Sequence, residues 1–374
     1  MNLSVHQTIQ DFDSESWNKL VPNNFPFAKY EFLEALEISD SVGQRTGWHP
    51  FFLAAKKESV LIGAMILYLK TNSYGEYIFD WAWADAWKKC GMDYYPKLTS
   101  SIPFTPATGP KILTTEIENP QEVTHSLLEK SIELQKELSA SSTHILFSTP
   151  KENEAALELD FDLRHTFQFH WHNQGYESFE SFLANLKQKK RQKIRRERKE
   201  IALNSLLEII EITGEEVKKY SEAFYELYLS TIDKKWSYDY LTKDFFVRIF
   251  KEMPDNILIY LAYKDSELIA GTLNFIGGEK IFGRYWGAFE EVQHLHFELC
   301  YYRPIEYAIK NKLTIFEAGA QGEHKIQRGL IPQKTYSLHH LPQNRITDLI
   351  RRSMEQEQRQ ADRLIKQGPS MIYK

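Results

Sequence analysis

GTLNFIGGEKIFGRYWGAFEEVQHLHFELCYYRPIEYAIKNKLTIFEAGAQGEHKIQRG, residues Gly271 to Gly329, carries the clearest signal of the fold. Its first part has two apolar runs separated by a glycine-containing turn, which predicts two neighbouring strands, and its middle part has helical spacing. A further apolar run, 314–318, leads into a polar loop punctuated by glycines. This order of elements predicts an α/β fold with mixed sheets.

The first half of the chain has the same order of elements. FFLAAKKESVLIGAMILYL (51–69) matches ILIYLAYKDSELIAGTLNFI (257–276) in pattern, and each half places helical segments before and after this strand pair. We interpret this as a duplicated β-α-α-β-β-β-α-β unit, because the strand and helix periods change at the same offsets in both halves. Chance similarity between two mixed sheets is the alternative, and it leaves the order of elements unchanged.

The duplication also predicts the third strand of the first half. GEYIFDWAWADAW (75–87) matches EKIFGRYWGAFEE (279–291), so we expect a strand over 76–81. The following segment, 81–110, is expected to be a loop because Gly, Pro and Thr interrupt it. Within it, DYYPKLTSSI (93–102) is expected to lie opposite CYYRPIEYAI (300–309) of the second half.

With 374 residues the chain exceeds the size at which one hydrophobic core keeps growing, so two domains are expected. We expect the first over 1–165 and the second over 166–345, with a basic helical segment at 178–201. The charged tail, 346–374, predicts a peripheral C-terminal helix.

Charge and cysteine usage indicate a soluble cytoplasmic protein. The net charge is −5, and Cys90 and Cys300 are too few for a disulfide framework. The first residues lack the basic and apolar regions of a signal peptide. The most apolar run, Val60 to Leu69, is about half of the roughly 20 residues that span a bilayer, so no membrane span is expected.

One short segment is strongly basic. KQKKRQKIRRERK, Lys187 to Lys199, has nine basic residues and one acid, and it continues a helix with apolar residues from Phe179 onward. Cations at this density repel one another unless an anion lies nearby, which favours phosphates of a nucleotide, a coenzyme or RNA. A solvated helix that pairs with acidic neighbours explains the segment equally well.

Candidate functional residues gather at the strand ends of the stretch 271–329. Glu317, Glu323 and His324 carry groups that transfer protons, whereas Lys325 and Arg328 can hold an anion. A second cluster near a helix end contains Lys235 and Trp236, where lysines also suit the helix dipole. We expect a small-molecule or peptide substrate to contact Arg284, Tyr285, Trp286, Glu298, Gln321, Lys325, Arg328, Lys235 and Trp236.

A metal site is the rival explanation for the histidines. His294, His296 and Glu298 form an HxHxE pattern, and His324 follows later. Leu295 and Phe297 between them are equally expected of a strand edge that packs on the core, and no cysteine or second HxH supports ligation, so no metal is expected. Dinucleotide, P-loop, GxSxG and HExxH motifs are also missing.

Several strings resemble a known family. They are GYESFESFLANLKQKKRQKIRRERKEI (175–201), TIDKKWSYDYLT (231–242), FGRYWGAFEEVQHLHFELCYY (282–302) and FEAGAQGEHKIQRG (316–329). Together with matching strings in the first half they resemble the bacterial FemAB-like family labelled "peptidogalycan biosynthesis/recognition". The doubled unit looks like the GNAT acyltransferase fold in its tandem, FemAB-type form.

This resemblance implies a transferase that moves an acyl or aminoacyl group onto an amine. A typical GNAT N-acetyltransferase binds coenzyme A through an (R/Q)xxGx(G/A) loop, and this chain has GAFEEVQHLHFELCYY (287–302) at the matching place. Both acyl-CoA and aminoacyl-tRNA therefore remain possible donors, and the Lys187–Lys199 helix suits tRNA. Such a reaction needs a base and a proton donor, for which Glu317 or His324 and Tyr301 or Tyr302 are the candidates.

Two functions of other classes remain open. The first is a non-catalytic GNAT-fold protein that binds a cell-wall precursor or an anionic metabolite, and the missing coenzyme loop motivates it. The second is an RNA-binding module, which only the basic helix supports. Fold analogy alone does not decide among them.

Overall fold

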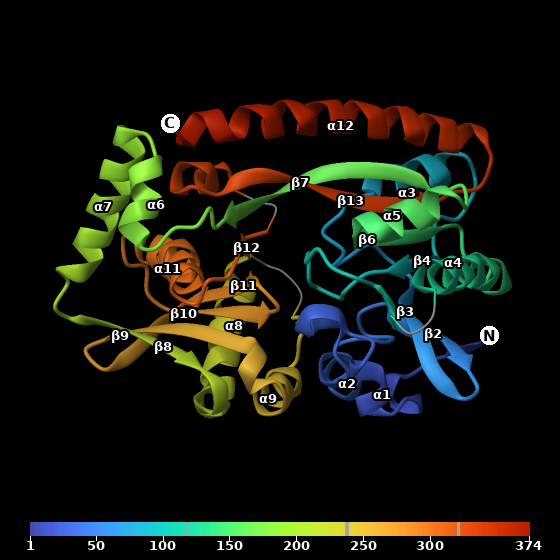
Figure 1. The fold of residues 1–374 in the computed structure, drawn as a ribbon, viewed down its shortest axis with the longest axis horizontal. Helices are drawn as coiled ribbons and strands as arrows, with labels where there is room; N and C mark the ends of the chain where they lie inside the picture. The colour runs from blue at the N-terminus through green and yellow to red at the C-terminus, as the bar shows by residue number, and fades with distance from the viewer. Residues whose placement is uncertain (117–118, 236–238, 320–321) are drawn as a thin grey trace. The chain divides into compact units, whose positions relative to one another are not determined.

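A computed structural model describes residues 1–116, 119–235, 239–319 and 322–374, apart from the side chains of 233–235 and 323 (Figure 1). The chain forms two compact units. The first consists of Met1–Thr166 and Lys334–Asp362, and the second of Phe167–Gln333 and Arg363–Lys374. The chain therefore passes between the units more than once.

The first unit is a mixed sheet with helices. Its strands follow the order β1-β2-β3-β4-β6-β13, and β5 pairs with β3. The strands are β1 Asn2–His6, β2 Trp48–Lys57, β3 Val60–Lys70, β4 Lys97–Ser100, β5 Ile112–Thr114, β6 Thr143–Ser148 and β13 Ile331–His340. The helices are α1 Ser14–Asn18, α2 Tyr30–Ile38, α3 Trp81–Lys89, α4 Pro120–Glu137 and α5 Pro150–Leu157, with 3-10 turns at Ile9–Asp11, Pro22–Asn24 and Pro26–Ala28.

The second unit repeats this plan in the strand order β7-β12-β11-β10-β9-β8. Its strands are β7 Asp162–His172, β8 Leu207–Thr213, β9 Ile257–Lys264, β10 Glu267–Gly277, β11 Lys280–Ala288 and β12 Ile315–Glu317. Its helices are α6 Phe179–Asn185, α7 Gln188–Ala202, α8 Ser221–Lys235, α9 Lys243–Glu252, α10 Leu295–Phe297 and α11 Arg303–Lys310, with a π-helical turn at Glu298–Tyr302 and 3-10 turns at Gly214–Tyr220, Pro254–Asn256 and Glu323–Arg328.

The pairing of the strands confirms the predicted mixed α/β class and the order of elements. In the first unit β1, β2, β3 and β4 are antiparallel, and β4 is parallel to β6. In the second unit β8, β9, β10 and β11 are antiparallel, and β11 is parallel to β12. Both units therefore contain a β-α-α-β-β-β-α-β order, to which the first unit adds α3 between β3 and β4 and β5 after β4.

The first unit takes one strand from the part of the chain that follows the second half. The segment Tyr336–His340 of β13 pairs with β6, although it follows the whole second half in sequence. In the second unit, His170–His172 of β7 pairs with β12. The sequence repeat gave no sign of β13, because the predicted unit ended one strand earlier.

Apolar side chains alternate along these strands and meet the helices. In the first unit Leu127 and Leu128 of α4 pack against Leu53 and Met65 of the sheet. In the second unit the core is richer in aromatic residues, with Trp171, Phe316 and Tyr302 fully buried. No helix among the described residues combines the length and apolarity needed to cross a bilayer.

The long C-terminal helix, α12 (Arg345–Ile372), lies partly in each unit. It occupies nearly the whole of the tail in which a C-terminal helix was expected. In the first unit its residues Ile350 and Met354 pack in a small core with Trp83 and Trp87. These contacts account for the few apolar residues of the charged tail.

The predicted strand at 76–81 is wrong, and the predicted loop at 81–110 is wrong in part. The third strand is β4, and α3 occupies Trp81–Lys89. Lys97, inside β4, is buried and donates hydrogen bonds to Glu76 (2.8 Å) and Asp80. Buried charged residues therefore occupy the region in which the apolar pattern of a strand was expected. DYYPKLTSSI contributes a strand, whereas CYYRPIEYAI contributes a helix, and the two are not equivalent.

Gly287 of β11 allows a test of how this strand packs against α8. A Cβ on Gly287 would lie 1.9 Å from the backbone oxygen of Leu227 in α8, whereas a Cβ on Gly283 would lie 3.0 Å from the Phe316 ring. We expect Gly287→Ala to lower the free energy of unfolding by about 1–3 kcal/mol or more, because backbone cannot move aside. Gly283→Ala is the matched control, and equal denaturation midpoints for the two variants would contradict this packing.

Candidate active site

The candidate site is built on an irregular helix of the second unit. The chain leaves β11, takes a left-handed conformation at His294 (φ 68°) and enters α10, the π-helical turn Glu298–Tyr302 and α11. A π-helical turn inserts an extra residue into a helix and is frequent at functional sites. Here it buries both Tyr301 and Tyr302.

Tyr301 and His324 form a hydrogen-bonded pair. The Tyr301 hydroxyl lies 3.0 Å from Nε2 of His324. Burial raises the pKa of Tyr301 well above its usual value. Burial, Arg328 and Lys325 lower the pKa of His324 below 6.5. At neutral pH the pair therefore combines a protonated phenol with a neutral imidazole, which is the state required for proton transfer.

Glycine makes room for this histidine. A Cβ on Gly322 would lie 2.4 Å from the His324 ring, and Gly322 has a φ of 100°, which L residues rarely adopt. The His296 ring packs against the rings of Tyr301, His324 and Trp286, with centroids 5.5, 6.2 and 5.2 Å away. Aromatic neighbours thus fix the orientation of the pair.

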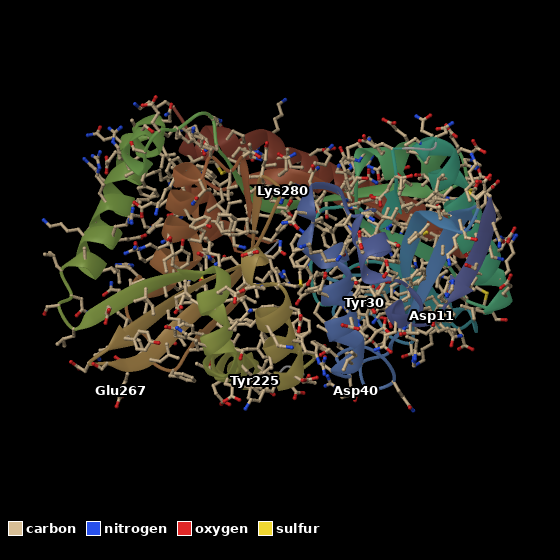
Figure 2. All side chains as sticks on the ribbon, turned by 60° about the horizontal axis from the view of Figure 1, so that its bottom comes forward. Asp11, Tyr30, Asp40, Tyr225, Glu267 and Lys280 are labelled. Atoms are coloured by element: carbon tan, nitrogen blue, oxygen red, sulfur yellow. The ribbon has the colours of Figure 1, made fainter. Side chains whose placement is uncertain are left out.

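Glu317 lies at the end of β12. Its carboxylate is buried, accepts a hydrogen bond from Lys280 (3.0 Å) and lies 4.0 Å from His170; Lys280 is labelled in Figure 2. Burial lowers the pKa of His170 to about 4, although Glu317 opposes this shift. Lys280, and not His170, therefore provides the positive charge beside Glu317.

Lys325 connects the His324 loop to the same strand end. Its ammonium donates to the backbone oxygen of Ala318 (2.5 Å) and lies 3.4 Å from that of Gly319. Burial lowers the pKa of Lys325 to about 8. Lys325, whose pKa lies near neutrality, therefore follows His324 in sequence and contacts the residue next to Glu317.

β11 continues beyond its pairing with β12, and this continuation contains Arg284, Tyr285 and Trp286. β12 pairs with β11 over Lys280–Phe282, and farther on Thr231 of α8 donates to the Trp286 carbonyl (2.5 Å). Tyr285 packs against Tyr228, and the Arg284 guanidinium lies 5.2 Å from the Tyr285 ring. Trp286 thus joins the Tyr301–His324 pair through His296, whereas Tyr285 faces α8.

A buried carboxylate holds two further predicted residues. Glu197 of α7 is 1% exposed and accepts two hydrogen bonds from Arg328 (3.0 and 3.1 Å) and one from the Tyr302 hydroxyl. Arg328 also stacks on the Phe297 ring at 3.3 Å and donates to the His324 carbonyl (2.9 Å). Tyr302 and Arg328 therefore hold the site together from inside.

Glu298, the first residue of the π-helical turn, contacts a different residue of α7. It accepts from Arg198 (3.1 and 3.2 Å) and from Arg303 (2.9 Å). Gln321 and Trp236 lie outside the described residues, as do the side chains of Lys235 and Glu323. Among the residues that the structure does describe, no group of His, Cys, Asp or Glu is arranged to hold a metal ion.

The structure brings Trp286, Tyr301 and His324 together around His296, and Lys325 bonds to the backbone that follows Glu317. It adds residues that the sequence analysis did not assign to the site. These are Glu197, His170 and Lys280. Glu197 had a detectable signal, because the one acid of the basic run shares a helical face with the apolar Ile194 and Ile201. His170 and Lys280 had none, because only the strand pairing places them beside Glu317.

The chain is similar to known proteins over most of its length. The FemAB-like family model, described as "Peptidogalycan biosysnthesis/recognition", matches residues 8–371. No curated protein matches the chain. The crystal structure of FemX is similar, with a TM-score of 0.55, 12% identity and coverage of 94% of this chain and 100% of that one.

Two other solved structures are also similar. The C-terminal domain of a putative lysylphosphatidylglycerol synthetase from Agrobacterium fabrum has a TM-score of 0.58 and 9% identity, covering 92% of this chain and 97% of that one. L-PGS from Bacillus licheniformis has a TM-score of 0.54 and 6% identity, covering 90% and 98%. At these identities the likeness shows a shared fold.

Removal of the buried carboxylate tests the support of the site. We expect Glu197→Ala to lower the free energy of unfolding by about 3–5 kcal/mol, because Arg328 is left buried without its anion. Glu200→Ala, on the same helix but half exposed, removes contacts to Arg196 (3.7 Å) and His294 (3.1 Å) and is expected to cost under about 1 kcal/mol. Similar urea midpoints for both variants would refute the supporting role of Glu197.

Proposed function

Because the chain belongs to the FemAB-like family and has its tandem GNAT-type fold, we propose that it is an acyl- or aminoacyltransferase that moves an acyl group onto an amine. The observation that carries the proposal is the Tyr301–His324 pair beside the end of β12. The reaction takes place in the cytoplasm, with a small molecule or peptide as acceptor.

In this proposal His324 is the base and Tyr301 the proton donor. The amine nitrogen attacks the acyl carbon, a C–N bond forms and the C–O or C–S bond to the donor breaks. His324 takes the proton that the nitrogen loses, and Tyr301 supplies a proton to the leaving oxygen or sulfur. Because Nε2 of His324 faces the Tyr301 hydroxyl, the amine proton is taken at Nδ1, and the Nε2 proton then passes to the Tyr301 phenolate. Both groups are then neutral again, and proton exchange with solvent restores the starting tautomer of His324.

The other predicted residues have supporting or binding roles in this proposal. Lys325 and Arg284 attract an anionic part of a substrate, and Trp286 forms an apolar wall. Glu317 positions the strand end through Lys280. Tyr302 and Arg328 stabilise the π-helical turn through Glu197, because their polar atoms are already engaged with it.

The donor is an acyl-CoA or an aminoacyl-tRNA. The segment between β11 and α11 has no glycine-rich loop for a pyrophosphate, which favours aminoacyl-tRNA or, as a second candidate, a non-catalytic protein that binds a cell-wall precursor. Incubation with acetyl-CoA or a pool of aminoacyl-tRNAs, together with amine-bearing muropeptides, distinguishes these functions. Product detected by mass spectrometry supports transfer, whereas a thermal shift without product supports the binding protein.

Variants of the pair test the chemistry once transfer is detected. We expect His324→Ala and Tyr301→Phe each to lower kcat by about 10²–10⁴-fold, the usual contribution of general acid–base catalysis. Tyr307→Phe, on the neighbouring α11, serves as control. Full turnover in both site variants would refute the mechanism.

The pH profile of the wild type gives a separate check. His324 acts unprotonated and its pKa is lowered from 6.5. The rate should therefore rise with pH through a value below 6.5 and be level around neutral pH. In His324→Ala this acid limb should vanish from the kcat profile, and an unchanged limb would assign it to another group.

A further inference from the structure

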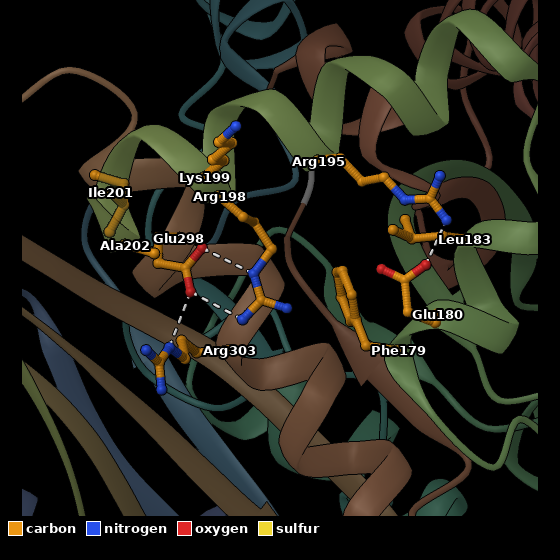
Figure 3. A pocket seen from close by; sticks show the side chains of 10 residues that line it. All are labelled: Phe179, Glu180, Leu183, Arg195, Arg198, Lys199, Ile201, Ala202, Glu298 and Arg303. Atoms are coloured by element: carbon orange, nitrogen blue, oxygen red, sulfur yellow. Dashed lines mark hydrogen bonds and ion pairs between the residues drawn. The ribbon is translucent and has the colours of Figure 1, made fainter. Parts of the chain in front are cut away.

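A pocket of about 320 Å³ lies between α6, α7 and the segment Glu298–Arg303 (Figure 3). The apolar part of its wall consists of Phe179, Leu183, Ile201 and Ala202. Its volume is at the lower end of the roughly 300–1,000 Å³ range of small-molecule sites. The pocket is therefore large enough for a small ligand or for one end of a larger one.

Cations outnumber carboxylates around this pocket. Four basic residues line it, and two carboxylates, Glu180 and Glu298, lie among them. A third carboxylate, Glu306, contacts Arg198 (2.8 Å) without lining the pocket. One positive charge therefore remains in excess; the four basic residues are Arg195, Arg198, Lys199 and Arg303.

Part of this lining is a fixed frame. The carboxylate of Glu298 is 3% exposed and joins Arg198 to Arg303, and Figure 3 shows the two guanidinium groups on either side of it. Arg198 also lies 4.4 Å from the centre of the Phe179 ring. These contacts hold the arginines in place without a ligand.

The remaining donors are available to a ligand. Arg303 uses its Nε for Glu298, and among the described residues its terminal nitrogens and the Lys199 ammonium have no hydrogen-bond partner. Arg195 pairs with Glu180 in an ion pair whose side chains are 51% and 64% exposed. Such exposed pairs contribute only about 0–1 kcal/mol, so Arg195 can turn to a ligand at little cost.

We propose that this pocket binds a small phosphorylated ligand. A phosphate carries one or two negative charges and several acceptor oxygens, which match the excess charge and the open donors of Lys199 and Arg303. The carbon part of the ligand contacts Phe179, Leu183 and Ile201. The pocket uses none of the atoms of the Tyr301–His324 pair, so the inference does not depend on the transfer reaction.

Calorimetric titration of the full chain with AMP, inorganic pyrophosphate and adenosine tests the proposal. We expect AMP to bind and uncharged adenosine to bind at least about tenfold more weakly, since one charge-assisted hydrogen bond contributes about 1.5–3 kcal/mol. Arg303→Gln and Lys199→Gln should each weaken AMP binding about tenfold. The control is Lys189→Gln, an exposed residue of the same helix outside the pocket, which should leave AMP binding unchanged.

Four results would overturn the inference. They are absence of AMP and pyrophosphate binding, equal binding of adenosine, and an equal loss in Lys189→Gln, which would indicate a non-specific basic surface. The fourth is binding of single-stranded RNA without AMP binding, which would make the helix an RNA surface. Circular dichroism spectra of the variants verify that the fold is retained, and failure of a transfer assay would leave the AMP result intact.

Discussion

The carboxylate of Glu197 is the contact on which the second unit's functional region depends. It lies in the middle of a strongly basic helix, yet it is one of the most deeply buried charged groups of the chain. Burying an ion pair costs desolvation energy, which is offset only when hydrogen bonds satisfy both partners. Arg328 and Tyr302 supply these bonds, and they fix the loop that carries His324 relative to the π-helical turn.

Two successive residues of α7, Glu197 and Arg198, contact different residues of the π-helical turn. Glu197 reaches the interior, where Tyr302 and Arg328 lie behind the proton-transfer pair. Arg198 contacts Glu298 at the start of the same π-helical turn and with it forms the frame of the charged pocket. Part of the positive charge of the segment therefore has a structural role. Residues whose donors have no partner among the described residues, such as Lys199, are the ones that can bind a ligand.

The sequence predicted the elements whose apolar pattern is regular. The paired runs at 51–69 and 257–276 became the hairpins β2–β3 and β9–β10, and the duplicated order of elements followed from them. It failed at 76–100, where the buried charges of Glu76, Asp80 and Lys97 replace an apolar pattern and where Trp83 and Trp87, four residues apart, form one face of a short helix. Of the site, the glycine-rich strand end and the tyrosine pair were visible in the residue types. Which tyrosine faces His324 and which one faces Glu197 depends on the π-helical turn, and no pattern in the residues reports it.

The late position of β13 in the sequence has a consequence for synthesis on the ribosome. The edge of β6 is covered by Tyr336–His340, which emerges only after the whole second half has been made. The N-terminal unit therefore cannot complete its sheet while it is being translated, and the small core around Trp83 and Trp87 must also wait for Ile346 and Ile350. An uncovered strand edge invites pairing with other chains. The nascent protein is thus most exposed to aggregation late in translation, and the first half taken alone is an unfinished sheet.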